Sequence, residues 1–250
     1  MRKRGFWLLL VAIVIMGFSI NVYADEAYYT TANGIELSRE EYEFLSTFYG
    51  TPYVDIMTRD QYNEFVEEDL INSDVTYKTV TTPNTVLINP GNNINSSSTS
   101  TQAKTLQIGA ACLPTKCIMS LVNTWHVDPG ITSWDVIGAW FDDVSLISHS
   151  HTYVSSTNYT YYFDNLKTES DGIGNSVKLP DDDTGLIINM AFTVTRGGTV
   201  YGSYQHATEN TTLANSQLYH LDFSGYGNVF DFYSTAIDVY DQMNGVDIDV

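Results

Sequence analysis

The chain has 250 residues, of which 43% are hydrophobic and 16% charged, and its formal net charge is −19 at pH 7. This length and apolar content allow one domain with a substantial core. The electrostatic field of so negative a protein repels nucleic acid and anionic membranes, which excludes both as the main partner. The same field attracts cations. The simpler interpretation of the acidity is that it keeps a secreted protein soluble.

The first 24 residues have the composition of a secretory signal peptide. Three basic residues at positions 2–4 precede an apolar run from Phe6 to Phe18, and Val22-Tyr23-Ala24 offers a small-residue cleavage site. The run is shorter than the roughly 20 residues of a membrane-spanning helix, and the alternative is an uncleaved anchor. We expect cleavage near Ala24 and a secreted or envelope-associated product that does not insert into a membrane. The lost segment holds three of the 11 basic residues and none of the 30 acidic ones, so the mature net charge is −22.

Residues 25–74 contain a short internal repeat that predicts a helical hairpin. The segment 37–42, Leu-Ser-Arg-Glu-Glu-Tyr, recurs as Met-Thr-Arg-Asp-Gln-Tyr at 57–62. In each copy the Ser or Thr can cap a helix while the Glu or Gln three positions later reaches back, which is a capping box. Gly50 followed by Pro52 ends the first helix. The helices continue with apolar residues at helical spacing, namely Leu45, Phe48 and Tyr49 in the first copy and Phe65, Val66 and Leu70 in the second.

The helical region is strongly acidic. It holds two basic and thirteen acidic residues, a net charge of −11. One interpretation is a docking surface for a partner. The other, which the pattern favours, is a solvated outer face on a small packing module.

Residues 75–104 have the composition of a linker. The segment is rich in Thr, Ser and Asn and has no acidic residue, with a strong turn at 89–93 and low complexity at 96–101. A stretch so poor in apolar residues buries little surface. We therefore expect a domain boundary near residue 104, with the helical module and the following domain folding separately.

Residues 105–250 predict an antiparallel β-sandwich, so the fold class is mainly β. Ile188, Met190, Phe192 and Val194 alternate with more polar residues, which indicates a strand with one solvated face. The segment 134–141 is apolar on both faces apart from Asp135, which indicates a central strand covered on both sides. Turn residues recur at the spacing of a sandwich, at 128–130, 171–172, 181–185, 196–198 and 224–225.

The two cysteines, Cys112 and Cys117, are five positions apart between two predicted strands. In an oxidising compartment a disulfide that closes a hairpin is the natural interpretation. Zinc needs about four ligands and redox motifs favour Cys-x-x-Cys, so neither alternative fits well.

Histidines and acids in the β domain offer weak signals for catalysis or metal binding. His149 and His151 project from one face if the chain is extended there, but no third metal ligand stands at motif spacing. His220 and Asp222 have the same relation, without an accompanying catalytic motif. The acids at 142–143 and Glu169 are a pair of the kind glycosidases use, a pattern that many acidic domains match by chance. We assign no catalytic residue.

Two aromatic groups are candidate ligand sites. Tyr201, Tyr204, Gln205 and His206 form a polar aromatic cluster after a glycine turn, and they are the preferred ligand-binding residues. The alternative is a stacking platform for a glycan on Tyr159, Tyr161 and Phe163, although aromatics at alternate positions are more often ordinary core.

Asp181, Asp182 and Asp183 are a candidate calcium site. They supply hard oxygen ligands in a loop before a strand, as extracellular calcium sites do, although the spacing is not that of an EF-hand. The competing interpretation is a solvated turn tip. No other cofactor is expected.

Several short segments carry a resemblance to a known group. They are Tyr28-Tyr29-Thr30 with Asn33-Gly34-Ile35, Glu41-Tyr42, residues 133–138 (Ser-Trp-Asp-Val-Ile-Gly) and residues 200–207 (Val-Tyr-Gly-Ser-Tyr-Gln-His-Ala). With these, the chain resembles uncharacterised secreted proteins of low-GC Gram-positive bacteria, gut species included. The resemblance implies export and a helical module before a β domain, and it implies no functional residue.

The sequence favours a non-catalytic extracellular binding or structural protein whose ligand is a glycan or a protein. The alternative is a secreted hydrolase acting on glycan or peptide, which requires a cleft where histidine and carboxylate side chains converge. A membrane-active protein is disfavoured by the mature charge of −22.

Overall fold

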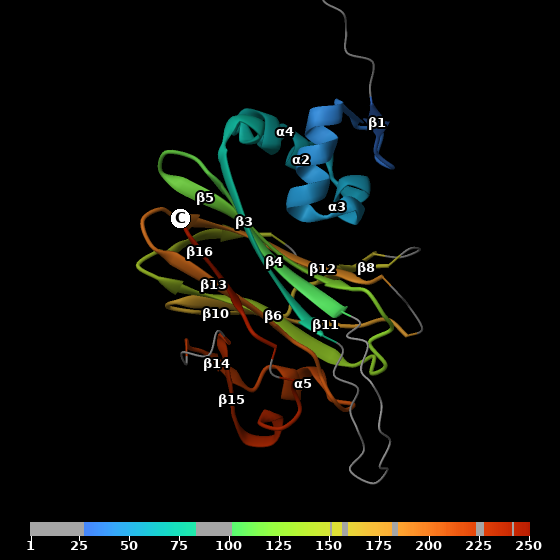
Figure 1. The fold of residues 1–250 in the computed structure, drawn as a ribbon, viewed down its shortest axis with the longest axis vertical. Helices are drawn as coiled ribbons and strands as arrows, with labels where there is room; N and C mark the ends of the chain where they lie inside the picture. The colour runs from blue at the N-terminus through green and yellow to red at the C-terminus, as the bar shows by residue number, and fades with distance from the viewer. Residues whose placement is uncertain are drawn as a thin grey trace, which may run out of the picture.

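The computed structural model describes residues 28–83, 102–150, 152–156, 160–181, 185–223, 228–241 and 243–250. Over these residues the fold is mainly β, with antiparallel sheets and a small helical module before them, which confirms the predicted fold class. Figure 1 shows four layers: the helices, a seven-stranded sheet, a five-stranded sheet and a C-terminal segment. The predicted signal peptide lies outside the described residues. None of the described helices has the length and apolar content to cross a membrane.

The helical module begins with a two-stranded hairpin and continues with four helical segments. In chain order these are β1 (Tyr29–Thr30), β2 (Glu36–Leu37), α2 (Arg39–Tyr49), α3 (Thr51–Ile56), α4 (Arg59–Glu67) and the 3-10 turn η1 (Leu70–Asn72). Both predicted capping boxes are confirmed, with Ser38 and Glu41 at the start of α2 and Thr58 and Gln61 at the start of α4. Each box satisfies backbone donors that a helix start leaves free.

The module contains one helix more than the predicted hairpin. Gly50, with φ of 92°, ends α2 as expected. Pro52 then stands in the first turn of α3, where a missing N–H costs nothing, so the Gly-Thr-Pro sequence that ends one helix also starts the next. Val66, predicted to continue the apolar face of α4, is instead 51% exposed.

Two sheets form the sandwich, and every strand pair is antiparallel. The larger has the order β3 (Asp74–Pro83), β4 (Gln102–Cys112), β5 (Lys116–Trp125), β12 (Ile187–Thr195), β8 (Thr152–Ser155), β9 (Thr160–Phe163), with β7 (Leu146–His149) also paired to β12. The smaller has the order β10 (Leu166–Glu169), β11 (Gly172–Lys178), β6 (Trp134–Asp142), β13 (Thr199–Gln205), β16 (Val246–Asp249). The central place of β6 confirms the strand predicted to be covered on both sides.

The C-terminal segment lies against the outer face of the five-stranded sheet. It contains α5 (Leu213–Ser216), β14 (Tyr219–Leu221), β15 (Phe230–Phe232) and the 3-10 turn η2 (Ser234–Ala236). Val136 of β6 packs there in one apolar cluster with Tyr219 and Phe230. This layer covers the outer face of the middle of the five-stranded sheet.

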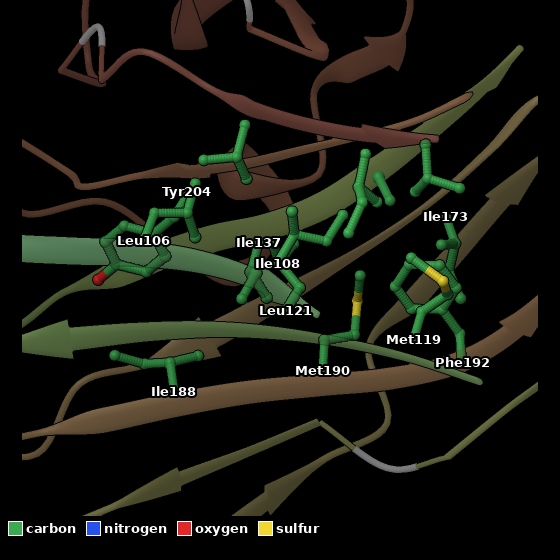
Figure 2. Packing of buried hydrophobic residues seen from close by; sticks show 14 of the residues in the cluster. Leu106, Ile108, Met119, Leu121, Ile137, Ile173, Ile188, Met190, Phe192 and Tyr204 are labelled. Atoms are coloured by element: carbon green, nitrogen blue, oxygen red, sulfur yellow. The ribbon is translucent and has the colours of Figure 1, made fainter. Parts of the chain in front are cut away.

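The main core lies between the two sheets. Figure 2 shows Ile188, Met190 and Phe192 of β12 side by side with Ile137 and Leu121, and all five are at most 2% exposed. The predicted inward face of β12 is therefore confirmed.

The opposite face of β12 is not solvated, so the prediction of one wet face is wrong. Asn189 is 0% and Ala191 7% exposed because the helical module covers them. The amide of Asn189 donates to the backbone oxygen of Tyr49 at 3.1 Å. The side-chain nitrogen of Asn189 therefore keeps a hydrogen-bond partner although it is buried. A sequence pattern does not reveal such a partner.

The predicted linker is wrong at both ends. Residues 75–83 belong to β3 and residues 102–104 to β4, and the two strands pair in register from Asp74 opposite Cys112 to Thr82 opposite Lys104. Threonine is β-branched and suits a strand, so a composition that resembles a linker also suits an edge strand. The rest of the predicted linker, residues 84–101, lies outside the described residues.

The helical module and the sandwich share one apolar cluster. Leu45, Phe48 and Phe65 of the module pack with Ile118 of β5 and Ala191 of β12. This shared cluster argues against the expectation that the two regions fold separately, since neither side has a complete core there without the other.

The disulfide Cys112–Cys117 is confirmed and joins residues directly opposite each other at the end of the β4–β5 hairpin. Closing so short a loop stabilises the fold by about 2 kcal/mol. We expect the double variant Cys112→Ala/Cys117→Ala to lose about this much in urea unfolding, and the reduced wild type to match it. Unchanged stability in both samples would contradict the prediction.

Candidate functional site

A cavity of about 140 Å³ lies between the helical module and the seven-stranded sheet. Its helical wall carries Leu45, Met57, Phe65 and Leu70, each at most 4% exposed. The sheet wall and the rim add Tyr49, Tyr53, Gln61, Glu64, Ile118, Ser148, His149, Ser150, Ala191, Phe192 and Thr193. We call this cavity the groove. It has an apolar floor and a polar rim, the usual make-up of a ligand site.

The internal repeat builds the helical wall of the groove. Leu45 and Phe65 are equivalent positions of the two copies, and the capping boxes fix where α2 and α4 begin and hence where both side chains point. Met57, in the position before the second box, is 1% exposed and lines the same space. On the sheet side the small side chain of Ala191 leaves room that a larger residue would fill.

The rim presents one carboxylate beside aromatic rings. Glu64 is exposed, and within the described residues its side chain makes no hydrogen bond or ion pair. Burial, followed by the charge of Glu64, raises the pKa of the Tyr53 hydroxyl, and both residues line the groove. Tyr53 stacks on Tyr49 with ring centroids 4.5 Å apart. The rim therefore places a negative charge beside a set of tyrosines that pack on one another.

A second site is a polar cluster buried at one end of the sandwich. Asp135 of β6, 0% exposed, accepts hydrogen bonds from the Tyr204 hydroxyl and from the backbone N–H of Ala207, the latter at 3.0 Å. Nδ1 of His206 lies 2.9 Å from Asp135 Oδ2. The Trp125 indole donates to the Tyr204 oxygen at 3.0 Å. Each polar group of this set has a partner, as buried polar groups require.

Lys104 and Asp241 extend the buried cluster. Lys104, 2% exposed, pairs with Asp241, and its Nζ lies 5.1 Å from the centre of the Trp125 ring. Burial disfavours the charged form of His206, but the Asp135 carboxylate outweighs this and raises the pKa of His206 above its ordinary value. Burial and then Asp135 raise the pKa of Tyr204 well above the usual value. The cluster ties β6 and β13 to the segment before β16, where Asp241 lies.

The four predicted ligand-binding residues do not form one surface. Tyr204 and Gln205 are 0% exposed, and the Gln205 amide donates to the backbone oxygen of Met243 at 3.0 Å. His206 is 7% exposed and belongs to the buried cluster. Tyr201 lies on the outer face of the five-stranded sheet against Trp140, with ring centroids 5.6 Å apart. The sequence pattern did not predict this burial. The polar atoms of Tyr204 and His206 point inward because they bond to Asp135, which lies 69 residues before Tyr204.

The candidate metal residues are only partly within the described chain. Asp181 accepts a hydrogen bond from the Thr132 hydroxyl, whereas Asp182, Asp183 and His151 lie outside the described residues. Among the residues that the structure describes, no three His, Cys, Asp or Glu side chains gather as a metal site would need. Calcium binding by the three aspartates stays a prediction.

The remaining candidates lie at the surface. His220 pairs with Glu169 at 3.6 Å and stacks on Tyr233, so its acidic partner is not the predicted Asp222. Hydrogen bonds from the backbone N–H of Leu221 and from Lys167 outweigh burial and lower the pKa of Glu169. Tyr161 is 44% exposed on β9, Phe163 is partly buried, and Tyr159 lies outside the described residues. The acids at 142–143 are exposed at the end of β6.

The sequence did not predict the groove, although it singled out several of its residues. Leu45, Phe65 and Leu70 were predicted to continue the two helices at helical spacing, and His149 was a weak metal candidate. The internal repeat is the sequence signal that could have predicted the helical wall of the groove, since equivalent positions of two similar helices tend to face the same neighbour. Nothing local, however, places Ile118 and Ala191 opposite these helices.

The chain matches no family model and no curated protein sequence. Several solved structures resemble parts of it, three of them as follows. The first is the KRT10-binding region domain of the pneumococcal serine-rich repeat protein PsrP, with 10% identity and a TM-score of 0.30 over 53% of this chain and 88% of that chain. The second is the collagen-binding domain of the Erysipelothrix rhusiopathiae surface protein RspB, with 6% identity and a TM-score of 0.28 over 70% of this chain and 59% of that chain. The third is the enzymatically active domain of tailspike protein 4 of bacteriophage CBA120, with 10% identity and a TM-score of 0.25 over 56% of this chain and 20% of that chain. All three TM-scores lie below 0.5, so these likenesses are not evidence of a shared function.

Proposed function

We propose that this protein is a non-catalytic extracellular or envelope-associated binding protein that engages a protein partner through the groove. The observation that carries the proposal is the cavity of about 140 Å³ with a buried apolar floor, at whose rim Glu64 has no ion pair among the described residues. A space of this size suits one side chain of a partner rather than a whole small molecule, since ligand pockets usually span about 300–1,000 Å³. The N-terminal signal-peptide composition supports the extracellular location.

A secreted hydrolase is the second candidate, because the buried His206 lies beside a carboxylate. His206 pairs with Asp135 in the way that orients a general base. The Trp125 ring packs edge-on against that imidazole at 4.8 Å between centroids, and His206 is 7% exposed. His149 and Glu64 line the groove together, yet no hydrogen bond or ion pair joins them within the described residues. Non-catalytic binding is the better-supported function.

Filling the groove tests the proposal. We expect Ala191→Leu to place a larger side chain in the cavity and to weaken binding at least about tenfold, or 1.4 kcal/mol. The probe is a set of peptides selected by the wild-type mature chain from a random phage-displayed library, with affinities then measured by calorimetry. Thr168→Leu is the matched control, since it adds the same apolar side chain at an exposed position of β10 in the other sheet.

Two outcomes contradict the proposal. One is a selection that enriches no peptide for the wild-type chain. The other is a set of peptides that bind Ala191→Leu as tightly as they bind Thr168→Leu and the wild type. Circular dichroism of each variant establishes that it is folded before its affinity is compared.

A further inference from the structure

The rim of the groove carries charge in an arrangement that selects among side chains. Glu64 is exposed, has no hydrogen bond or ion pair within the described residues, and lines the groove together with Tyr53. Tyr53 and Tyr49 stack with their rings 28° from parallel. A carboxylate at the rim attracts a cation and repels an anion.

We propose that the groove accepts the side chain of a lysine or arginine from a protein partner. The inference rests on the proposed function and names the chemistry of its occupant. Lysine and arginine have apolar stems of three or four methylene groups and a charged head, and they commonly bury the stem while the head stays in a polar surrounding. The floor formed by Leu45, Phe65 and Ala191 suits the stem, and Glu64 at the rim suits the head.

The surrounding charge favours the same occupant. The module has thirteen acidic and two basic residues between positions 25 and 74, so a cationic segment is drawn toward it. Its own two cations already have partners: Arg39 lies over the Tyr28 ring at 4.7 Å and Arg59 over the Tyr62 ring at 5.9 Å. Lys116, on the neighbouring hairpin, pairs with Glu68 at 2.8 Å. These cations therefore leave the charge of Glu64 available to a partner.

The second copy of the repeat shows the same chemistry inside the module. Arg59 lies over the face of Tyr62, and the Tyr62 hydroxyl donates to Glu41 at 2.7 Å. A guanidinium, a tyrosine ring and a carboxylate thus already pack together next to the groove. At the groove itself the carboxylate of Glu64 is present, and the cation is the element that a partner would supply.

Matched amino-acid derivatives test the charge preference directly. The probes are Nα-acetyl-lysine N-methylamide and its norleucine counterpart, which has a similar stem and no charge, each titrated into the 15N-labelled mature chain. We expect the amide signals of Ala191, Thr193 and Ser150 to shift, and the lysine compound to bind about fivefold more tightly, the upper range for one exposed ion pair. Glu64→Gln is expected to remove this preference. Glu43→Gln, the same change at an exposed position of α2 outside the groove, is expected to retain it.

The outcomes separate this inference from the proposed function. If the norleucine compound binds as tightly as the lysine compound, or if Glu64→Gln keeps the preference, the cation inference is overturned while the groove remains a binding site. If neither compound shifts the groove amides at concentrations of tens of millimolar, both the inference and the groove are overturned. Ala191→Leu is expected to abolish the shifts from either compound.

Discussion

Replacing Asp135 by alanine is expected to lower the free energy of unfolding by about 3–5 kcal/mol, the usual cost of removing one partner of a buried ion pair. The carboxylate is 0% exposed and accepts from Tyr204 and from the Ala207 N–H, with His206 beside it. Without it these three groups stay buried and lose their acceptor. Urea unfolding of a chain that begins at Asp25 measures the loss.

Asp142→Ala is the matched control, since it removes an exposed carboxylate from the same strand. It is expected to change stability by less than about 0.5 kcal/mol. A loss from Asp135→Ala no larger than that of the control would show that the buried cluster does not stabilise the fold.

The same cluster predicts how stability depends on pH. The pKa of His206 is raised in the folded protein, so its ion pair with Asp135 contributes fully below the unfolded value of about 6.5 and is lost as the pH rises through the folded pKa. Stability of the wild type is therefore expected to fall on raising the pH from 6 toward 8. In His206→Gln, which keeps a polar side chain without a titrating group, this fall should be absent. An equal fall in the variant would assign it to other groups.

A chain that begins at Lys104 is expected to lose cooperative unfolding and to aggregate. Removing the preceding residues uncovers the outer face of the seven-stranded sheet, where Ile118 and Ala191 now pack against the helices, and leaves Asn189 without its bond to Tyr49. It also deletes β3 and exposes the long edge of β4. Such an uncovered apolar sheet face and open edge favour association between molecules.

The control for this experiment is a chain that begins at Tyr28, which keeps the helical module and lacks only the segment before it. It is expected to stay soluble and to unfold in one cooperative step. Thermal unfolding by circular dichroism and size-exclusion chromatography distinguish the two chains. A soluble, cooperative chain from Lys104 onward would show that the sandwich folds without the module.

The sequence by itself determined the helix starts, the disulfide and the strand patterns, because each depends on residues that are close along the chain. The capping boxes at Ser38 and Thr58 need only residues three positions apart, and the disulfide between Cys112 and Cys117 needs only a short turn. The alternation in β12 and the apolar segment of β6 follow from the two-residue period of a strand. These features involve neighbours along the chain, so their residue types are enough to predict them.

Tertiary structure alone decided which faces of the strands are buried and where the groove lies. Ala191 and Asn189 are buried because helices more than a hundred residues earlier cover them, and Tyr204 and His206 turn inward because Asp135 is on the adjacent strand. The groove joins Leu45 and Phe65 to Ile118 and Ala191, residues that only packing brings together. Burial depends on what lies on the other side of a residue, and a pattern along one segment carries no information about that neighbour.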